Sequence, residues 1–254
     1  MEVDIQFVPF PPNLHLLSGR VVVVIDVLRA TSVMVHAMSE GALEIIPVTT
    51  IEEALKMAKG LPWNSIVLGG ERGSKKIPEF DLGNSPREYV AERVKGKKLI
   101  LTTTNGTKAF HLVSLGKDIL VGSFFNIGAI AKRCLELDRN LLIFPSGDEG
   151  NFSLEDTICG GMLIEFITKK RRKPISLTDT SQCARILYKR FEENLLEAFY
   201  LSHHGKELVH RGFGEDLVDC ASVNTTDIVP IFRDGVIRTD RMQRTDGRRQ
   251  KAKR

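Results

Sequence analysis

Short apolar runs alternate with longer segments of helical periodicity along most of the chain. The apolar runs predict strands at Val21–Ile25, Leu43–Val48, Ser65–Leu68, Lys98–Leu101, Ile119–Val121 and Leu141–Phe144. The segments between them predict helices at Thr31–Ser39, Ile51–Ala58, Pro86–Val94, Gly106–Leu115, Ile127–Leu137 and Leu154–Thr168. Most of these strands are apolar throughout, as strands buried on both faces are. The pattern therefore predicts a three-layer α/β/α fold around a mixed, mostly parallel sheet.

The C-terminal part continues with helices and ends in a hairpin. Leu177–Leu201 predicts one or two amphipathic helices, and Glu215–Ala221 predicts a short one. Two apolar runs, Ile228–Phe232 and Val236–Ile237, flank an Asp-Gly pair, which is a hairpin signal. We expect this hairpin to give the sheet an antiparallel edge, and residues 1–237 to form one domain.

Composition narrows the class of protein. With 254 residues and 42% hydrophobic content, the chain is long enough to bury a full core. No apolar run reaches the length of a membrane span and the N-terminus carries no secretory leader, so we expect no membrane contact and a cytoplasmic location. The four cysteines lie far apart without zinc-ligand spacing, which predicts buried, reduced thiols.

The net charge of +4 is concentrated at the C-terminal end. Residues 238–254 carry eight Lys or Arg against two Asp, so residues 1–237 have a net charge of −2. This tail has no aromatic residue to stack on bases, so we predict a disordered, solvated end rather than nucleic-acid binding. A homo-oligomer is compatible with the sequence.

Polar residues follow several predicted strands, and in such a sheet ligands bind beyond the carboxyl ends of the strands. Asp26 comes directly after the first strand, and Arg29 and Thr31 follow it. An aspartate there suits a metal ligand or a nucleophile, while an arginine suits bidentate binding of an anion. The alternative is that Asp26 caps the next helix, although it lies several residues before the predicted start.

Two further loops carry glycines beside polar side chains. In Gly69–Gly73, glycines flank Glu71 and Arg72 and let the backbone approach a ligand closely, although a flexible turn has the same composition. The loop Phe80–Pro86 includes Gly83, Asn84 and Ser85 and leads into a predicted helix, whose free N–H groups favour an anion.

A fourth junction, Thr102–Lys108, groups hydroxyls and backbone donors around one point. Thr103, Thr104, Asn105, Gly106 and Thr107 resemble a phosphate cradle, although the segment lacks the Walker pattern. The structural alternative is a threonine-rich strand with an ordinary Asn-Gly turn.

Glu155 and Asp156 fall in the first turn of the helix predicted at Leu154–Thr168, where acids often only complement the helix dipole. Together with Asp26 they would supply the carboxylate oxygens that Mg²⁺ prefers.

Four motifs in this order resemble those of the 2-phosphosulfolactate phosphatase family. They are Ile25–Ser32, Gly69–Gly73, Phe80–Pro86 and Thr102–Thr107, and the resemblance extends from residue 1 to about residue 237. It implies a three-layer α/β/α fold and the Mg²⁺-dependent hydrolysis of (R)-2-phospho-3-sulfolactate, a small anionic phospho-acid, to 3-sulfolactate and phosphate. This reaction is a step of coenzyme M biosynthesis.

The junction chemistry motivates a hypothesis for the site. Asp26, Glu155 and Asp156 hold Mg²⁺, while Arg29 and the Thr102–Thr107 loop hold the phosphoryl group. Glu71 adds a ligand or acts as a base, and Arg72 binds the carboxylate or sulfonate. The sequence leaves two alternatives open: a phosphatase for another small 2-phospho-carboxylic acid, and a non-catalytic protein that binds an anionic metabolite.

Overall fold

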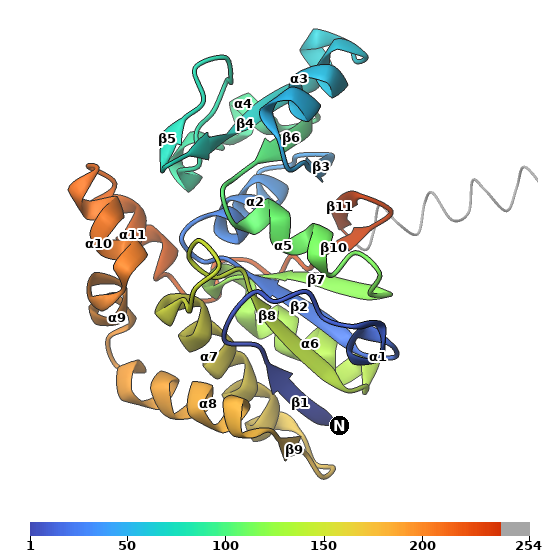
Figure 1. Cartoon of the computed structure of the whole chain (residues 1–254), viewed down its shortest axis with the longest axis vertical. Coiled ribbons are helices and arrows are strands. Elements are labelled where there is room, and N and C mark those ends of the chain that lie inside the picture. The colour runs from blue at the N-terminus through green and yellow to red at the C-terminus, as the bar shows by residue number, and fades with distance from the viewer. Residues whose placement is uncertain (240–254) are drawn as a thin grey trace, which may run out of the picture.

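A computed structural model of the chain describes residues 1–239 (Figure 1). In this part of the chain the strands are β1 (Glu2–Ile5), β2 (Val21–Ile25), β3 (Glu44–Pro47), β4 (Ile66–Arg72), β5 (Lys75–Lys76), β6 (Lys98–Thr102), β7 (Asp118–Gly122), β8 (Leu141–Pro145), β9 (Ser176–Leu177), β10 (Pro230–Arg233) and β11 (Val236–Thr239). They form one sheet in the order β5-β4-β6-β3-β11-β10-β7-β2-β8-β1-β9.

Helices cover this sheet on both faces. Those of residues 1–239 are α1 (Leu14–Leu17), α2 (Ala30–Ser39), α3 (Ile51–Lys59), α4 (Ala91–Val94), α5 (Gly106–Leu112), α6 (Ile127–Leu137), α7 (Leu154–Lys170), α8 (Asp179–Phe191), α9 (Leu195–Leu201), α10 (His203–His210) and α11 (Gly214–Cys220). In Figure 1, α7 to α11 run along one side of the molecule. The predicted α/β class and mixed, mostly parallel sheet are confirmed.

The apolar strand β2 packs against helices on both faces of the sheet. All five of its residues are buried. Because side chains alternate across a strand, Val21, Val23 and Ile25 pack in one core with α6, α7 and α8, and Val22 and Val24 pack in another with α2 and α5. A third, smaller core lies between α3 and the strands β4 and β6.

The predicted hairpin forms, but its predicted position at a sheet edge is wrong. The strands β10 and β11 pair antiparallel through a two-residue turn in which Asp234 and Gly235 both have positive φ, of 51° and 79°. The hairpin lies between β3 and β7, inside the sheet. Ile231 and Phe232 pack on opposite faces, so this apolar run has the pattern of a central strand.

Two local predictions differ from the structure. The helix expected at Pro86–Val94 is a single 3₁₀ turn, Pro86–Glu88, followed by the short helix α4. Leu177–Leu201 contains two helices, α8 and α9, and after Ser202 the chain forms α10, which the pattern did not indicate.

Other expectations concern cysteines, the tail and membranes. Cys183 is exposed on α8, contrary to its predicted burial, because Ala184 and Tyr188 form the face of that helix that packs inward. Cys134, Cys159 and Cys220 are buried and unpaired, as expected. Arg238 and Thr239 belong to β11, and the rest of the predicted tail lies outside the described residues. None of the helices in residues 1–239 has the length and apolar character needed to span a bilayer.

Candidate active site

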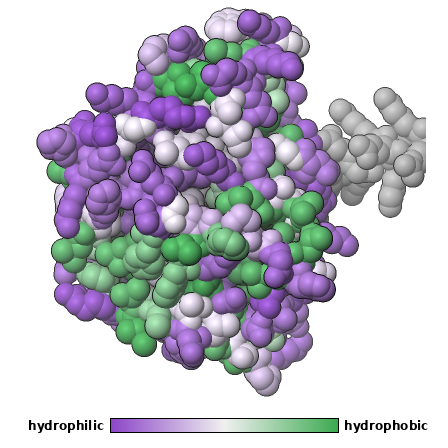
Figure 2. Space-filling view, viewed as in Figure 1, coloured by the Kyte–Doolittle hydropathy of each residue, from purple (hydrophilic) through white to green (hydrophobic). Residues whose placement is uncertain are grey.

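The polar ends of distant strands and loops meet around one cavity of about 90 Å³. Strand register accounts for part of this convergence: Ile25 of β2 is level with Pro145 of β8, and Gly70 of β4 is level with Thr102 of β6. Residues lining the cavity are Asp26, Leu28, Arg29, Glu71, Gly73, Ser74, Asn84, Thr103, Thr104, Asn105, Asp148, Glu149, His204, Glu207 and Arg211. In Figure 2, hydrophilic side chains cover the area where α10 lies.

Asp26 is held at the start of α2. Its Oδ1 accepts a hydrogen bond from the Ala30 N–H at 3.1 Å, and its backbone carbonyl accepts one from the Thr31 hydroxyl at 2.9 Å. Gly106 lies so close that a Cβ atom there would be 2.5 Å from Asp26 Oδ2. Burial raises the pKa of Asp26 above its usual value, although the nearby His204 opposes that shift.

Two more buried acids lie behind Asp26 on the first turn of α7. Asp156 Oδ1 accepts a hydrogen bond from the Val27 N–H at 2.8 Å, which ties α7 to the β2 loop. Burial, with repulsion from Asp26 and Glu155, raises the pKa of Asp156 well above its usual value. Burial also raises the pKa of Glu155. Neither acid lines the cavity, but Asp156 is close enough to Asp26 and to Glu155 to be repelled by both.

Arg29 is almost wholly enclosed, with 2% of its surface exposed. Its Nη1 donates to Asp216 Oδ2 at 2.6 Å, its Nη2 donates to the Ser74 carbonyl at 3.2 Å, and its guanidinium lies 4.3 Å from the ring centre of Phe213. Ser85 donates to the other oxygen of Asp216 at 2.6 Å. Asp216 therefore fixes an arginine and a serine from two separate predicted motifs.

Glu71 organises the opposite wall. Its carboxylate accepts hydrogen bonds from the Thr104 N–H at 2.7 Å, the Thr104 hydroxyl at 3.1 Å and the Ser74 N–H at 2.8 Å. In the same loop, the hydroxyls of Thr103 and Thr107 bond to each other's backbone N–H groups. The threonine loop is thus held rigidly, with several of its donors already used.

The helix α10 supplies a wall that the sequence analysis missed. His204, Glu207 and Arg211 recur at helical spacing and line the cavity. His204 Nδ1 lies 3.6 Å from a carboxylate oxygen of Asp148. Burial alone would lower the pKa of His204, but attraction from Asp148, Glu155 and Asp26 raises it above its usual value. A histidine beside another histidine was the only local signal of this wall.

Seven of the predicted site residues line the cavity: Asp26, Arg29, Glu71, Asn84, Thr103, Thr104 and Asn105. Seven others lie outside the lining. Thr31, Ser85, Gly106, Thr107, Glu155 and Asp156 interact with lining residues or with their direct partners. The Gly83 carbonyl instead accepts a hydrogen bond from the Tyr89 hydroxyl. Arg72 is absent from the lining, because its Nη2 donates to the Thr49 carbonyl and the Thr102 hydroxyl, at 3.0 and 2.9 Å.

Unpartnered polar atoms in the lining indicate a ligand. Within residues 1–239, Arg29 Nε, Asn84 Oδ1 and His204 Nδ1 are buried side-chain atoms of lining residues that have no hydrogen-bond partner. Such atoms are rare in native proteins, so three of them on one small cavity indicate polar groups that a bound molecule would satisfy. The same part of the chain has no group of three His, Cys, Asp or Glu side chains already arranged to hold a metal.

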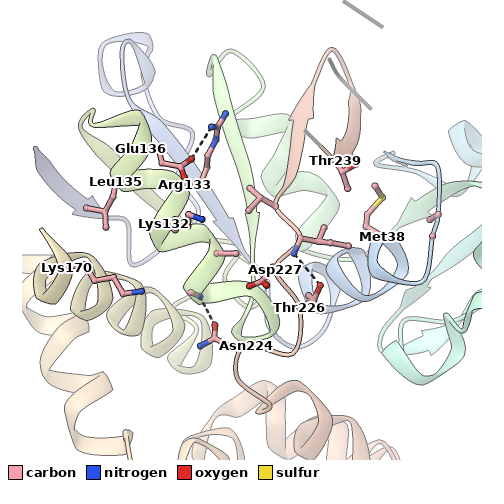
Figure 3. Close-up of a pocket in the computed structure, with 16 residues that line it drawn as sticks. Met38, Lys132, Arg133, Leu135, Glu136, Lys170, Asn224, Thr226, Asp227 and Thr239 are labelled. Carbon is pink, nitrogen blue, oxygen red and sulfur yellow. Dashed lines mark hydrogen bonds and ion pairs between the residues drawn. The ribbon is translucent and has the colours of Figure 1, made fainter. Parts of the chain in front are cut away.

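A larger cavity, of about 1520 Å³, lies elsewhere between α6, the end of α2 and the chain leading into β10. Figure 3 shows Lys132 and Arg133 of α6 on one side and Thr226 and Asp227 on the other. It contains none of the predicted site residues, and the acids and donors described above lie around the smaller cavity. We therefore place the candidate active site in the smaller one.

Comparison with known proteins gives the family. The sequence profile of the 2-phosphosulpholactate phosphatase family matches residues 10–235. The chain belongs to this family. Three relatives carry the name "Probable 2-phosphosulfolactate phosphatase". That of Clostridium tetani is 40% identical over 94% of this chain and 100% of its own length. Those of Caldanaerobacter subterraneus and Symbiobacterium thermophilum are 40% and 38% identical over 88% and 89% of this chain, and over 92% and 97% of their own lengths.

Proposed function

We propose that this member of the family is a Mg²⁺-dependent phosphatase that hydrolyses (R)-2-phospho-3-sulfolactate to 3-sulfolactate and phosphate. Family membership and the relatives' names support a phosphoric monoester hydrolase. The observation that carries the proposal is the convergence of Asp26, Arg29, Glu71 and Asn105, from four separate segments, on one cavity with unpartnered buried polar atoms. That arrangement supplies acids, a cation and backbone donors around one concave space.

The requirement for Mg²⁺ is supported by the chemistry of the donor set. Asp26 and Asp156 are buried acids that repel each other, and a divalent cation would relieve that repulsion. The lining also carries more acids than bases, which would repel a multiply charged anion. We propose that Asp26, supported by Asp156 and Glu155, would hold Mg²⁺, which commonly uses one or two carboxylates plus water and substrate phosphate. Bound there, Mg²⁺ would offset charge on the phosphoryl oxygens.

The chain's own groups supply the rest of the site in this proposal. Arg29 donates to the phosphoryl group with its orientation fixed by Asp216, and the backbone around Asn105 adds neutral donors. Glu71 holds the Thr104 loop in place through three hydrogen bonds. Two routes are compatible with the proposal: attack by water, and a covalent phosphoenzyme on Asp26. Acid quenching and mass measurement of Asp26 during turnover separate them.

The test is a phosphate-release assay with 2-phosphosulfolactate, with and without Mg²⁺ and after chelation. We expect Mg²⁺-dependent release that EDTA abolishes. We expect Asp26→Asn to lose both turnover and Mg²⁺ affinity. Asp138→Asn removes a surface acid paired with Arg171 and Lys173 and serves as the matched control. Normal turnover and affinity in Asp26→Asn would remove Asp26 from the metal site.

The alternatives predict different results in the same assay. A panel of 2-phospho acids separates a phosphatase of other specificity, which would show no preference for the sulfonate. A non-catalytic protein would bind the anion without releasing phosphate. A role in coenzyme M biosynthesis and a cytoplasmic location stay predictions. The absence of nucleic-acid binding also stays a prediction, and truncation of the chain after Thr239 would test it.

A further inference from the structure

The proposed substrate carries three acidic groups, a phosphoryl, a carboxylate and a sulfonate. The cavity must supply donors or a cation for each of them. Within residues 1–239, the basic side chains that line it are Arg29, His204 and Arg211. Arg29 lies at the enclosed end, bonded to Asp216, and His204 lies beside Asp148. Arg72, the residue expected at the carboxylate or sulfonate, is not in the lining. A different cation must therefore hold the acid group farthest from the phosphoryl.

Arg211 is the most accessible of the three. It ends α10, and its own backbone N–H donates to the Glu207 carbonyl. The following Gly212 has a φ of +87°, which turns the chain away directly after it. The Arg211 side chain is 31% exposed, against 18% for His204 and 2% for Arg29. Of these three basic residues, Arg211 is thus the one nearest to solvent.

Glu207 holds the Arg211 guanidinium by one edge only. Both bonds go to Glu207 Oε1, from Nε at 3.0 Å and from Nη2 at 2.5 Å. In the described part of the chain, Nη1 has no partner. A guanidinium has five donors in a planar fork and binds two acids at once, so Glu207 leaves one edge available.

Resting on the proposed function, we infer that Arg211, oriented by Glu207, binds the sulfonate of the substrate and sets the preference for it. In 2-phosphosulfolactate the phosphoryl and carboxylate are both attached to C2, while the sulfonate is on C3 and extends farthest from the reacting atoms. We place the phosphoryl beside the buried Asp26 and Arg29, so the sulfonate extends towards the more exposed Arg211. Sulfonate is a permanently ionised oxyanion that suits paired guanidinium donors.

The experiment combines a change in the enzyme with a change in the substrate. We compare kcat/KM for 2-phosphosulfolactate and for 2-phospholactate, which lacks the sulfonate, in the wild type and in Arg211→Met. A charge-assisted hydrogen bond contributes enough for the ratio of the two kcat/KM values to fall by ~10 to 100-fold, mainly through KM. Arg211→Lys, which keeps the charge but loses the fork, should restore part of the ratio.

Arg190→Met is the matched control, because Arg190 also forms an exposed pair with a glutamate, Glu197, at 3.0 Å but does not line the cavity. Thermal midpoints within a few degrees of the wild type verify folding. An unchanged substrate ratio in Arg211→Met would overturn the inference, and so would equal losses on both substrates. If the wild type releases phosphate from neither substrate, the proposed function itself fails; phosphatase activity with an unchanged ratio removes only the role of Arg211.

Discussion

Asp216 of α11 joins Arg29 and Ser85, which precede it by 187 and 131 residues, through one buried carboxylate. One oxygen of Asp216 accepts from Arg29 and the other accepts from Ser85, each at 2.6 Å. Neither Arg29 nor Ser85 can therefore turn without losing a charge-assisted hydrogen bond. The buried guanidinium has this single carboxylate as its ion-pair partner within residues 1–239. The orientation of the cavity's innermost cation therefore depends on a helix near the C-terminal end.

Asp216→Asn should impair both the site and the fold. Removing the charge leaves Arg29 buried without compensation, and we expect a loss of ~1 to 3 kcal/mol in the free energy of unfolding. Misplacement of Arg29 should lower kcat/KM for phosphate release by ~10 to 100-fold. Steady-state kinetics and denaturant unfolding measure the two effects. Asp219→Asn, on the same helix but in a surface pair with Arg87, should change neither; equal losses in both variants would contradict this account.

Gly106→Ala should displace Asp26. A Cβ atom at position 106 would lie 2.4 Å from the Ala30 Cβ and 2.5 Å from Asp26 Oδ2, which is closer than real contacts allow. Relaxing that overlap costs ~1 to 3 kcal/mol of stability and moves a proposed metal ligand. We expect kcat to fall by ~10 to 100-fold, because small displacements at a reacting centre are costly.

The control for that substitution is Gly60→Ala. There the nearest atom would be the Met57 carbonyl oxygen, at an ordinary 3.6 Å, and the backbone φ is −87°. We therefore expect kcat and the thermal midpoint to fall in Gly106→Ala and to stay near the wild-type values in Gly60→Ala. Normal turnover in Gly106→Ala would show that Asp26 does not need its present position.

Sequence patterns predicted the parts of the site that follow directly from strands. The run Val21–Ile25 is apolar throughout and forms β2 with the same bounds, so Asp26 lies at the sheet end where the pattern put it. Residues 103–107 follow β6 for the same reason, and Glu71 lies beside them because β4 and β6 pair in parallel. In each case, the position of a strand's carboxyl end determines where the side chains near that end lie.

Features set by tertiary packing were not predicted. Asp216 and His204 come from short helices. Nothing local distinguishes Asp216 from other polar residues on a helix, and the neighbouring His203 is a weak signal for His204. Arg72 was expected to bind substrate because glycines and an acid surround it in the sequence. In the structure its Nη2 instead donates to the Thr49 carbonyl and the Thr102 hydroxyl. The hairpin was placed at an edge because its turn signal carries no information about which strands flank it.

The proposed binding of Mg²⁺ should weaken as the pH falls. Burial raises the pKa of Asp26, and burial with repulsion from Asp26 and Glu155 raises the pKa of Asp156. Both acids therefore keep their protons at pH values above 3.8, the ordinary pKa of an aspartate. Each proton competes with the cation and is released when Mg²⁺ binds. Affinity should therefore be greatest above the raised pKa values and decline as the pH drops through them.

Titration calorimetry of Mg²⁺ binding in two buffers of different ionisation enthalpy measures the protons released. We expect net proton release that increases as the pH is lowered towards the raised pKa values, and a smaller release in Asp156→Asn. The gain in thermal midpoint on adding Mg²⁺ should likewise grow with pH. Binding that is independent of pH across this range would exclude the two acids as its determinants.

Glu165→Gln should destabilise the packing of α7 against α8. The Glu165 side chain is 3% exposed and receives Arg185 at 2.7 Å and Lys169 and Lys189 at 3.2 Å each. Burial by itself would raise the pKa of Glu165, but these three cations lower it from 4.5 to about 2. Because the cations are themselves partly exposed and screened, we expect a loss of ~1 to 2 kcal/mol in the free energy of unfolding at neutral pH.

The pH dependence of that loss identifies its cause. A carboxyl whose pKa is lower in the folded state stabilises the fold above its ordinary pKa, and this contribution disappears as the pH falls from 4.5 to about 2. The difference between wild type and Glu165→Gln in denaturant unfolding should therefore shrink over that interval. Glu136→Gln, which alters an exposed pair with Arg133 on α6, should cost less than ~0.5 kcal/mol. A Glu165→Gln difference that persisted at pH 2 would point to lost packing rather than lost charge.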